Sequence, residues 1–343
     1  MTITWPGGVR LEDIEHDDPR WLARRQECIG ASEIAGMMGL GKYGSPAQVY
    51  LNKVGTIVDI DNEAMALGRW AEPYILDYVL DKLEAAVFSA FDGGGEDQST
   101  YTHRDQPRMT ATPDGWLRTE AQPPRIIEIK RTDARGAKEE WEAMQAFADG
   151  DGPIPAYTYA EQGWLQVQSA MEVLDVDDGY LCACITDRVA LKLVAGLPIT
   201  DEEIRIIPVK RDRALGAMMV KQVGAFWSRY VDAGVCPATT EADLEALRKS
   251  WPIAEQGSSI VLRGHGGAVR KLKHAKVKVK AWEKVAKTIE ASLRAAIGTA
   301  ETADVGGGHT LTLKTTHRKE STRTIAASSF RTLRVVKPKR GKR

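Results

Sequence analysis

The sequence predicts a mixed α/β or α+β fold, a central mixed sheet flanked by helices, with a basic helical extension behind it. Helix-like and strand-like segments are interleaved over residues 1–250, an order typical of a sheet with helices packed on it. With 343 residues, 43% of them hydrophobic, the chain can bury a full core. From residue 251 on the composition becomes strongly basic, so we expect residues 251–343 to form a separate extension.

The expected helices have apolar residues at helical spacing and recognisable start or stop signals. Ser32 is expected to cap a helix in a glycine-rich stretch, and a second helix begins near Pro46 and stops at Gly55. The other helices of the first 250 residues are expected at 21–27, 63–83, about 159–174 and 214–231.

Strand patterns occupy the gaps between these helices, at residues 108–112, 125–131, 180–185 and 204–210. The second of them is the most informative. Ile127 and Ile129 alternate with Glu128 and Lys130, so a strand would send both isoleucines to one face and both charges to the other. Two opposite charges on a core strand require an explanation.

Composition excludes several classes of protein. The four cysteines, Cys28, Cys182, Cys184 and Cys236, do not form paired CxxC motifs, which argues against a zinc site or iron–sulfur cluster and predicts buried reduced thiols. There is no apolar run of membrane-spanning length and no basic-then-apolar leader. We therefore expect a cytoplasmic protein without a membrane partner.

Charge is divided unequally along the chain. Residues 262–343 hold 21 Lys and Arg against 5 Asp and Glu, a local net charge of +16, and the other 261 residues carry −16. This division indicates a basic module directed at a polyanion. The alternative is that the basic segment docks on the acidic body of the same protein.

The basic segment contains a long amphipathic pattern followed by two short strand-like runs, HTLTLKTT and STRTIA, and a tail, KPKRGKR, that is expected to be disordered. A long helix with a basic outer face is predicted, because its apolar residues recur at about 3.5-residue spacing. These are Val269, Leu272, Val279, Trp282, Ala286, Ile289 and Leu293.

The charged strand becomes chemically meaningful together with the Pro-Asp-Gly turn that precedes it. Asp114 in that turn and Glu128 on the strand would form a hard oxygen site suited to Mg²⁺, and Lys130 could hold or polarise a water molecule. A metal ion, an activated water and an anionic substrate are the requirements of phosphodiester hydrolysis. The competing interpretation is an ordinary ion pair facing solvent.

Two of the expected helices carry polar residues that are further candidates for the site. Glu72 shares the inward stripe of its helix with Ile75, Leu76 and Val79, and a buried acid needs a partner, either a metal ion or a hidden arginine. The amides of Gln166 and Gln168 lie on an otherwise apolar helix and can either bridge substrate and site or face solvent.

A phosphate site is indicated near the N-terminus of the chain. Arg25 precedes Ser32 by seven residues, and backbone amides at a helix N-terminus together with a guanidinium form an anion cradle. The alternative is that Ser32 is only a helix cap.

Taken in order, Arg25 and the segments GASEIAGMMGL, LGRWAEP, TPDG, IIEIKRT and LQVQSAM resemble the YqaJ-type viral recombinase family. These are phage alkaline exonucleases related to lambda exonuclease, within the PD-(D/E)xK nuclease superfamily. The resemblance spans about residues 20–235 and implies a PD-(D/E)xK, restriction-endonuclease-like core over 1–250. It does not extend to residues 251–343.

The resemblance implies a role for each matching residue. Asp114, Glu128 and the backbone carbonyl of Ile129 would bind Mg²⁺, or Mn²⁺ as its substitute, Glu72 would help organise the metal site, and Lys130 would assist the nucleophilic water. Gln166 matches the glutamine near the active site of the family, with Gln168 as a weaker candidate. The residues implied at a 5′-phosphate are Arg25, Ser32 and Thr112, the last standing where a serine is common.

The implied activity is that of a metal-dependent deoxyribonuclease. It would degrade linear double-stranded DNA from 5′ to 3′ and leave 3′ overhangs for a phage single-strand annealing protein, in the cytoplasm of a bacterial host. Some relatives form rings around DNA, so a homo-oligomer is compatible with the resemblance. The alternatives are a non-catalytic DNA-end-binding protein and an endonuclease of the same superfamily. The intact Asp114, Glu128 and Lys130 favour an enzyme.

Overall fold

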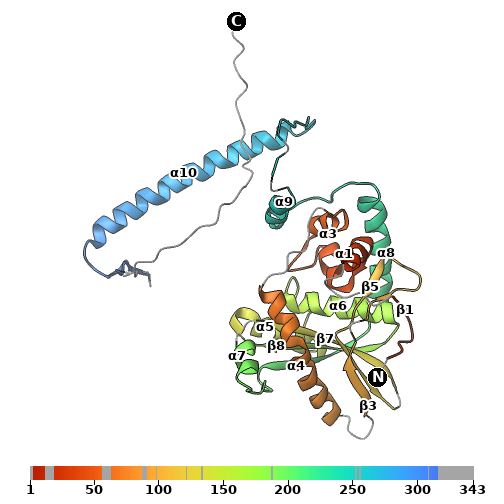
Figure 1. Ribbon diagram of the computed structural model, residues 1–343. Coiled ribbons are helices and arrows are strands. Elements are labelled where there is room, and N and C mark those ends of the chain that lie inside the picture. Colours follow the sequence, from red (N-terminus) through yellow and green to blue (C-terminus); the bar gives the residue numbers. More distant parts are fainter. Residues whose placement is uncertain are drawn as a thin grey trace. The chain divides into compact units, whose positions relative to one another are not determined.

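The computed structural model describes residues 3–11, 19–55, 63–86, 91–97, 99–120, 122–132, 134–186, 188–251, 253–254, 256–307 and 309–315. The chain divides into two compact units, Met1–Ser250 and Trp251–Arg343. Figure 1 shows the first as a sheet with helices around it and the second as a long helix with short flanking segments.

A five-stranded mixed sheet forms the centre of the first unit, which confirms the predicted fold class. Its strand order is β3-β6-β7-β8-β9, and only the β7–β8 pair is parallel. The strands are β3 (Phe91–Glu96), β6 (Gly115–Thr119), β7 (Gln122–Thr132), β8 (Asp178–Ile185) and β9 (Ile204–Lys210).

The two faces of this sheet are covered by different helices, because alternate residues of β7 point in opposite directions. Ile127 and Ile129 lie in one apolar cluster with Ile75 and Val79 of α4 (Glu63–Ala86), and α7 (Val189–Val194) joins the same cluster. The isoleucine half of the predicted alternation is therefore confirmed.

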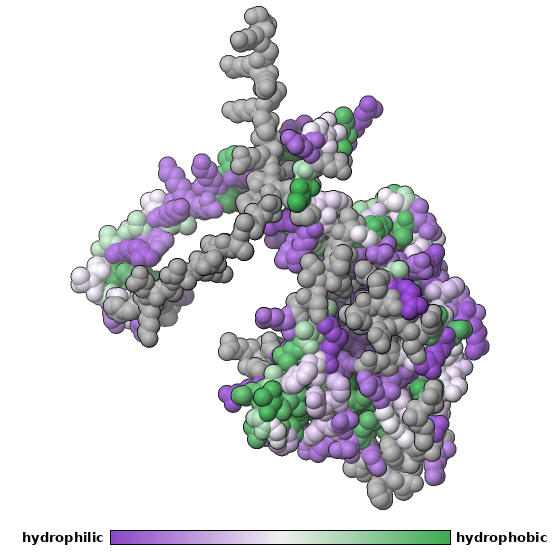
Figure 2. Space-filling view, in the orientation of Figure 1, coloured by the Kyte–Doolittle hydropathy of each residue, from purple (hydrophilic) through white to green (hydrophobic). Residues whose placement is uncertain are grey.

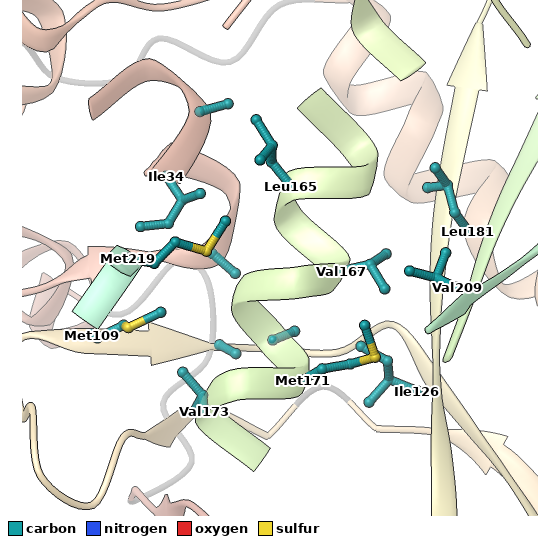
Figure 3. Packing of buried hydrophobic residues seen from close by; sticks show 14 of the residues in the cluster. Ile34, Met109, Ile126, Leu165, Val167, Met171, Val173, Leu181, Val209 and Met219 are labelled. Atoms are coloured by element: carbon teal, nitrogen blue, oxygen red, sulfur yellow. The ribbon is translucent and has the colours of Figure 1, made fainter. Parts of the chain in front are cut away.

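The opposite face packs against α6 (Tyr159–Leu174) and α5 (Ala134–Ala148). Figure 3 shows Val167 of α6 pointing toward Leu181 and Val209 on the sheet, while Leu165 points toward Ile34 on the other side of the helix. Helix α6 is thus buried on two sides, which fixes the polar side chains that it carries.

A second, four-stranded sheet of short strands lies on the far side of α6. Its order is β1 (Val9–Arg10), β4 (Tyr101–Thr102), β5 (Met109–Ala111) and β2 (Ile29–Gly30), with β2 and β5 parallel. Four helical segments near this sheet are α1 (Pro19–Glu27), the 3₁₀ turn η1 (Ala31–Glu33), α2 (Ile34–Met38) and α3 (Pro46–Lys53).

A buried ion pair joins three of these segments. The Lys53 ammonium of α3 lies 2.5 Å from a carboxylate oxygen of Glu33 in η1 and also donates to the backbone carbonyl of Arg25 at 2.7 Å. Its side chain is only 1% exposed. Because a buried charge is costly without a partner, this pair holds α1, η1 and α3 in one arrangement.

The helix expected at 214–231 differs in its last turn. Helix α8 (Arg213–Phe226) begins at the Asp212 cap, and the chain then continues as the π-turn η2 (Trp227–Val231). The first unit ends with the 3₁₀ turn η3 (Glu241–Asp243) and α9 (Leu244–Ser250). Asp243 is buried and accepts a hydrogen bond from the Ser45 hydroxyl at the N-cap of α3.

Cysteines follow the sequence expectation with one exception. Cys28, Cys182 and Cys184 are free and buried, but Cys236 is exposed, contrary to the prediction of buried thiols throughout. It lies in the loop between η2 and η3, where it is not covered by the core.

The second unit is built around α10 (Gly266–Ile297), which matches the predicted long helix, and a hairpin of β10 (Thr302–Asp304) and β11 (Thr310–Thr312). The run expected as a strand at 321–326 and the basic tail lie outside the described residues. Over the described ranges, none of the helices combines the length and the apolar character needed to cross a membrane.

Candidate active site

Asp114 and Glu128 are brought together by the pairing of β6 and β7. The antiparallel register ends with Gly115 opposite Ile127, so Asp114 stands next to Glu128 one position further on. The backbone N–H of Ile129 donates to Asp114 Oδ2 at 2.6 Å, which fixes the aspartate across the two strands. Gly115 permits the close approach of α4, because a Cβ there would lie 2.7 Å from Leu76 Cδ1.

Glu128 is one of the few buried charged residues of the protein, with 2% of its surface exposed. Its Oε1 accepts a hydrogen bond from the Lys130 ammonium and a second from Gln166 Nε2 at 2.5 Å. The Glu128–Lys130 pair is therefore not the solvent-facing ion pair that the sequence left open. It is a partnered buried charge within the sheet–helix interface.

Helix α6 approaches β7 closely enough to place Gln166 on Glu128. Gly163, one turn earlier, makes this possible, since a Cβ there would lie 3.5 Å from Lys130 Cγ and 3.0 Å from Leu181 Cδ1. Gln168 points elsewhere: its amide donates to the carbonyl of Lys210 at 2.7 Å and accepts from Asp212 N–H at 2.8 Å. Gln168 thus joins β9 to α8 and does not belong to the site.

Glu72 reaches the site from α4, on the opposite face of the sheet from α6. It is half-buried, and its neighbours Ala71 and Ile75 are fully buried. Burial and the charge of Asp114 raise the pKa of Glu72 to about 8, while Lys130 and Arg69 lower it. The sequence left two partners open for Glu72, a metal ion or a hidden arginine. The arginine that acts on Glu72, Arg69, is exposed and therefore not hidden.

Burial and neighbouring charges also shift the pKa values of the other ionisable groups of the site. Burial and the charge of Asp114 raise the pKa of Glu128 to about 8. Burial also raises the pKa of Asp114, against the opposing effects of Lys130 and the Ile129 amide. Burial alone would lower the pKa of Lys130, but the carboxylates of Glu128 and Asp114 raise it, so the ammonium stays protonated.

Two further residues act on this cluster electrostatically and were not found in the sequence. Glu96, the last residue of β3, pairs with Gly115, and its charge raises the pKa of both Asp114 and Glu72. Tyr159, the first residue of α6, contributes to the raised pKa of Lys130. Glu96 follows the glycines of FDGGGE, which do not show a strand pattern, so no local signal identified it.

The site offers oxygen ligands of the kind that a divalent ion requires. Across the ranges that the structure describes, no three or more Asp, Glu, His or Cys side chains converge as a metal cage. Asp114, Glu128 and the carbonyl of Ile129 nevertheless suit Mg²⁺, which binds through one or two carboxylates and retains water. Burial raises the pKa values of both carboxyl groups, so a cation between them would stabilise their charged forms. The residues present fit such an ion.

The three residues expected at a 5′-phosphate lie along two neighbouring chain segments. Strands β2 and β5 run parallel, with Gly30 opposite Thr110, so Ser32 and Thr112 follow the same end of this pair. Both are exposed, and the Thr112 hydroxyl lies 3.0 Å from that of Thr100. Arg25 is half-buried in the last turn of α1. Thr112 precedes Asp114 by two residues, which brings this surface next to the carboxylates.

Ser32 does not have the capping role that the sequence predicted. It lies inside the 3₁₀ turn η1, whose N-cap is Gly30, and the carboxylate of Glu33 accepts from the Gly30 N–H at 3.0 Å. The long glutamate side chain reaches back to satisfy that amide, which leaves the Ser32 hydroxyl at the surface. The following helix α2 starts only at Ile34.

Comparison with solved structures gives distant matches. An alkaline exonuclease, LHK-Exo, from Laribacter hongkongensis matches with 22% identity and a TM-score of 0.44, covering 63% of this chain and 94% of its own; its complex with dAMP has a TM-score of 0.43 at the same identity and coverage. A phage related exonuclease from Haemophilus somnus 129PT matches with 15% identity and a TM-score of 0.37, over 60% of this chain and 94% of its own.

Comparison of the sequence with known families identifies a more specific similarity than the comparison with solved structures does. No curated protein matches the chain. One family model does, that of the YqaJ-like viral recombinase domain, over residues 20–177. This range contains Arg25, Ser32, Glu72, the two carboxylates of β6 and β7, and Gln166, which are the residues that the sequence motifs had singled out. Over residues 20–177 the chain is therefore similar to the YqaJ-like viral recombinase domain.

Proposed function

We propose that the protein is a Mg²⁺-dependent exonuclease that degrades linear double-stranded DNA from its 5′ ends. The observation that carries this proposal is the cluster of buried Glu128 with half-buried Asp114 and Lys130. It is held at the junction of β6 and β7, within the residues that match the YqaJ-like recombinase domain. Two acids and a lysine on adjacent strands supply a metal site and a cation, which together suit phosphodiester hydrolysis.

The metal would be held by Asp114, Glu128 and the carbonyl of Ile129, with Glu72 beside them. When bound, Mg²⁺ supplies charge neutralisation at the scissile phosphate and lowers the pKa of water. The chain prepares this site by keeping Asp114 fixed through the Ile129 N–H. Mn²⁺ would serve as a substitute, because it accepts the same oxygen ligands.

Lys130 and Gln166 position groups around Glu128. In the metal-free protein the carboxylates of Glu128 and Asp114 raise the pKa of Lys130, which keeps its ammonium protonated and able to donate. It would orient the attacking water or stabilise negative charge on the phosphate. Gln166 donates to the same carboxylate oxygen of Glu128, Oε1, as Lys130 does, so the two donors together would fix the orientation of that carboxylate.

The end preference is proposed to come from Arg25, Ser32 and Thr112. A guanidinium and two exposed hydroxyls adjacent to the carboxylates would hold a terminal 5′-phosphate by charge-assisted hydrogen bonds. The buried Lys53–Glu33 pair supports this surface from behind, because it joins Arg25 to η1. Digestion from that end would leave 3′ overhangs suited to a phage annealing protein.

The basic C-terminal unit is proposed to contact the DNA backbone. Residues 262–343 carry a net charge of +16, and a polycation gains affinity for duplex DNA by releasing counterions. The competing role is a clasp that neutralises the acidic first unit.

The test of the proposed activity uses purified protein with Mg²⁺ and two DNA substrates, a 5′-phosphorylated linear duplex and a closed circle of the same sequence. An exonuclease degrades only the linear DNA. Cleavage of the circle would identify an endonuclease, and DNA binding without loss of either substrate would identify a non-catalytic end-binding protein. Either outcome would overturn the proposal.

A further inference from the structure

Helix α10 carries a heptad repeat that extends over most of its length. From Leu272 onward, apolar residues recur at alternating three- and four-residue spacing without interruption, which is the a and d pattern of a coiled coil. The eight positions are Leu272, Ala275, Val279, Trp282, Ala286, Ile289, Leu293 and Ala296.

Within its own unit, this stripe is uncovered. No described residue of α10 is buried, and Trp282 and Ile289 are 71% and 55% exposed. Figure 2 shows hydrophobic and strongly hydrophilic residues side by side on this helix. A soluble protein rarely leaves such a continuous apolar surface open to water, so the stripe is expected to have a partner.

The sizes of the seam residues specify an antiparallel helix of the same sequence as that partner. When two copies of α10 run in opposite directions about a dyad between Ala286 and Trp282, each large residue meets a small or complementary one. Trp282 faces the second copy's Ala286, and Val279 faces the second copy's Ile289. Leu272 and Leu293 face alanines, at 296 and 275 of the second copy.

A parallel pair would pack poorly by the same rule. It would place Trp282 against the second copy's Trp282 and would align alanine with alanine at 275, 286 and 296, leaving one overfilled layer and three underfilled ones. Flanking charges favour the antiparallel register by a small margin. That register pairs Lys276 with the second copy's Glu290 at both ends and sets the two Glu283 side chains against each other once at the centre. The parallel register gives two attractive pairs of Lys278 with the second copy's Glu283, but also two repulsive pairs of Lys271 with the second copy's Lys276.

We infer that α10 is a dimerisation element, which pairs with α10 of a second copy of this chain as an antiparallel coiled coil. The pairing leaves the b positions on the outer face uncovered. In four successive heptads these are all basic: Lys273, Lys280, Lys287 and Arg294. Dimerisation therefore buries the apolar stripe and keeps the cationic line exposed, and it does not depend on the proposed nuclease activity.

The first test measures the mass of the full chain in solution by light scattering over a wide range of concentration. The wild type is expected at twice the 37.7 kDa of one chain. Trp282→Asp should weaken dimerisation by at least about a hundredfold, because it buries a charge in the seam. The matched control is Val277→Asp, the same change at a position that is 66% exposed and outside the stripe, which should stay dimeric.

The second test fixes the orientation and does not depend on a disruptive variant. In a Cys236→Ser background, Glu283→Cys places a thiol at the dyad of the antiparallel pair, where two like-charged glutamates would otherwise meet, and should crosslink with itself through a short thiol reagent. Leu272→Cys should not, because the two copies of residue 272 lie at opposite ends of the pair.

Three results would overturn the inference. These are a monomeric wild type at all concentrations, a wild-type assembly that Trp282→Asp leaves unchanged, and self-crosslinking through Leu272→Cys with none through Glu283→Cys. The last would indicate a parallel pair, and an assembly unaffected by Trp282→Asp would assign oligomerisation to the first unit.

Discussion

Helices α6 and α10 are both amphipathic, but they differ in what covers them. Helix α6 has apolar side chains packed against the central sheet on one side and against residues such as Ile34 on the other. Helix α10, with 32 residues, has no buried residue among the described residues of its own unit. Amphipathicity alone therefore does not reveal what a helix does. A helix packed on both sides can fix the position of one polar side chain, whereas a helix with an exposed apolar face indicates a binding surface.

The charges of the two units differ in the same way. In the first unit, the carboxylates of Asp114, Glu128 and Glu72 gather where burial raises their pKa values. In the second unit, the lysines and arginines of α10 remain in water. Buried charges carry chemistry because their energies respond to a ligand, whereas exposed ones carry long-range attraction.

The largest effect is expected from Asp114→Asn in the first unit. Removing a charged ligand from the proposed metal site should lower the rate of cleavage of linear duplex by about a thousandfold or more. The exposed Asp105→Asn is the matched control and should retain wild-type turnover. Both variants should unfold near the wild-type temperature. Near-normal cleavage by Asp114→Asn would remove the proposed site.

A smaller effect is expected at the proposed phosphate surface. Wild-type protein should degrade 5′-phosphorylated duplex faster than 5′-hydroxyl duplex, and Arg25→Ala should erase most of that preference, by roughly ten- to a hundredfold. Its neighbour Arg24→Ala serves as the comparison. Equal wild-type rates on the two ends would count against a terminal-phosphate pocket.

The basic b positions of α10 provide a test of the proposed contact between the second unit and DNA. Replacing Lys273, Lys280 and Lys287 by Gln keeps the helix and its seam but removes three cations. Duplex affinity should fall several-fold at low salt, and the slope of log affinity against log salt should drop by about 2–3 if all three contact phosphates. Truncation after Gly257 should weaken binding further with the catalytic residues intact. An unchanged slope with a thermally weakened first unit would favour the clasp.

The smallest effect concerns Glu72 in the metal-free protein. Its pKa rises from 4.5 to about 8 on folding, so between these pH values the folded state binds more protons than the unfolded state and the free energy of unfolding falls as pH increases. Glu72→Gln should remove this decline and be more stable than wild type above pH 8. The full shift corresponds to about 5 kcal/mol, and because Glu72 is only half-buried the expected gain is about 1 kcal/mol. Thermal unfolding at several pH values, with exposed Glu120→Gln as control, would show it. Identical pH profiles would contradict the raised pKa.

Much of the first unit could be predicted from sequence because its signals are local. The alternation of Ile127 and Ile129 with two charges marked β7, and helical periodicity marked α6 at its observed bounds. Strands β3 and β6 were missed, since FDGGGE and GWLRT are short and contain glycine, which lacks strand propensity. Helix α5 was also missed, because its polar residues dilute its apolar face.

The site was predicted to a similar extent. Asp114, Glu128, Lys130 and Gln166 were named from motifs, and the structure brings them together through the β6–β7 register and Gly163. Ser32 was misassigned as a cap because a serine before a helical pattern is the commonest signal, and only the fold shows that Glu33 reaches the Gly30 amide instead. Glu96 could not be found, because its proximity depends on a non-local strand pair.

The order in which the two ends of a duplex lose their label tests the proposed activity most directly. Linear duplexes labelled at either the 5′ or the 3′ end of one strand are incubated with the full chain and Mg²⁺, and acid-soluble label is followed with time. We expect the 5′ label to be released at once and the 3′ label only late, with no release when the metal is chelated. Early release of the 3′ label, or release of both labels in the presence of a chelator, would contradict a metal-dependent 5′-to-3′ exonuclease.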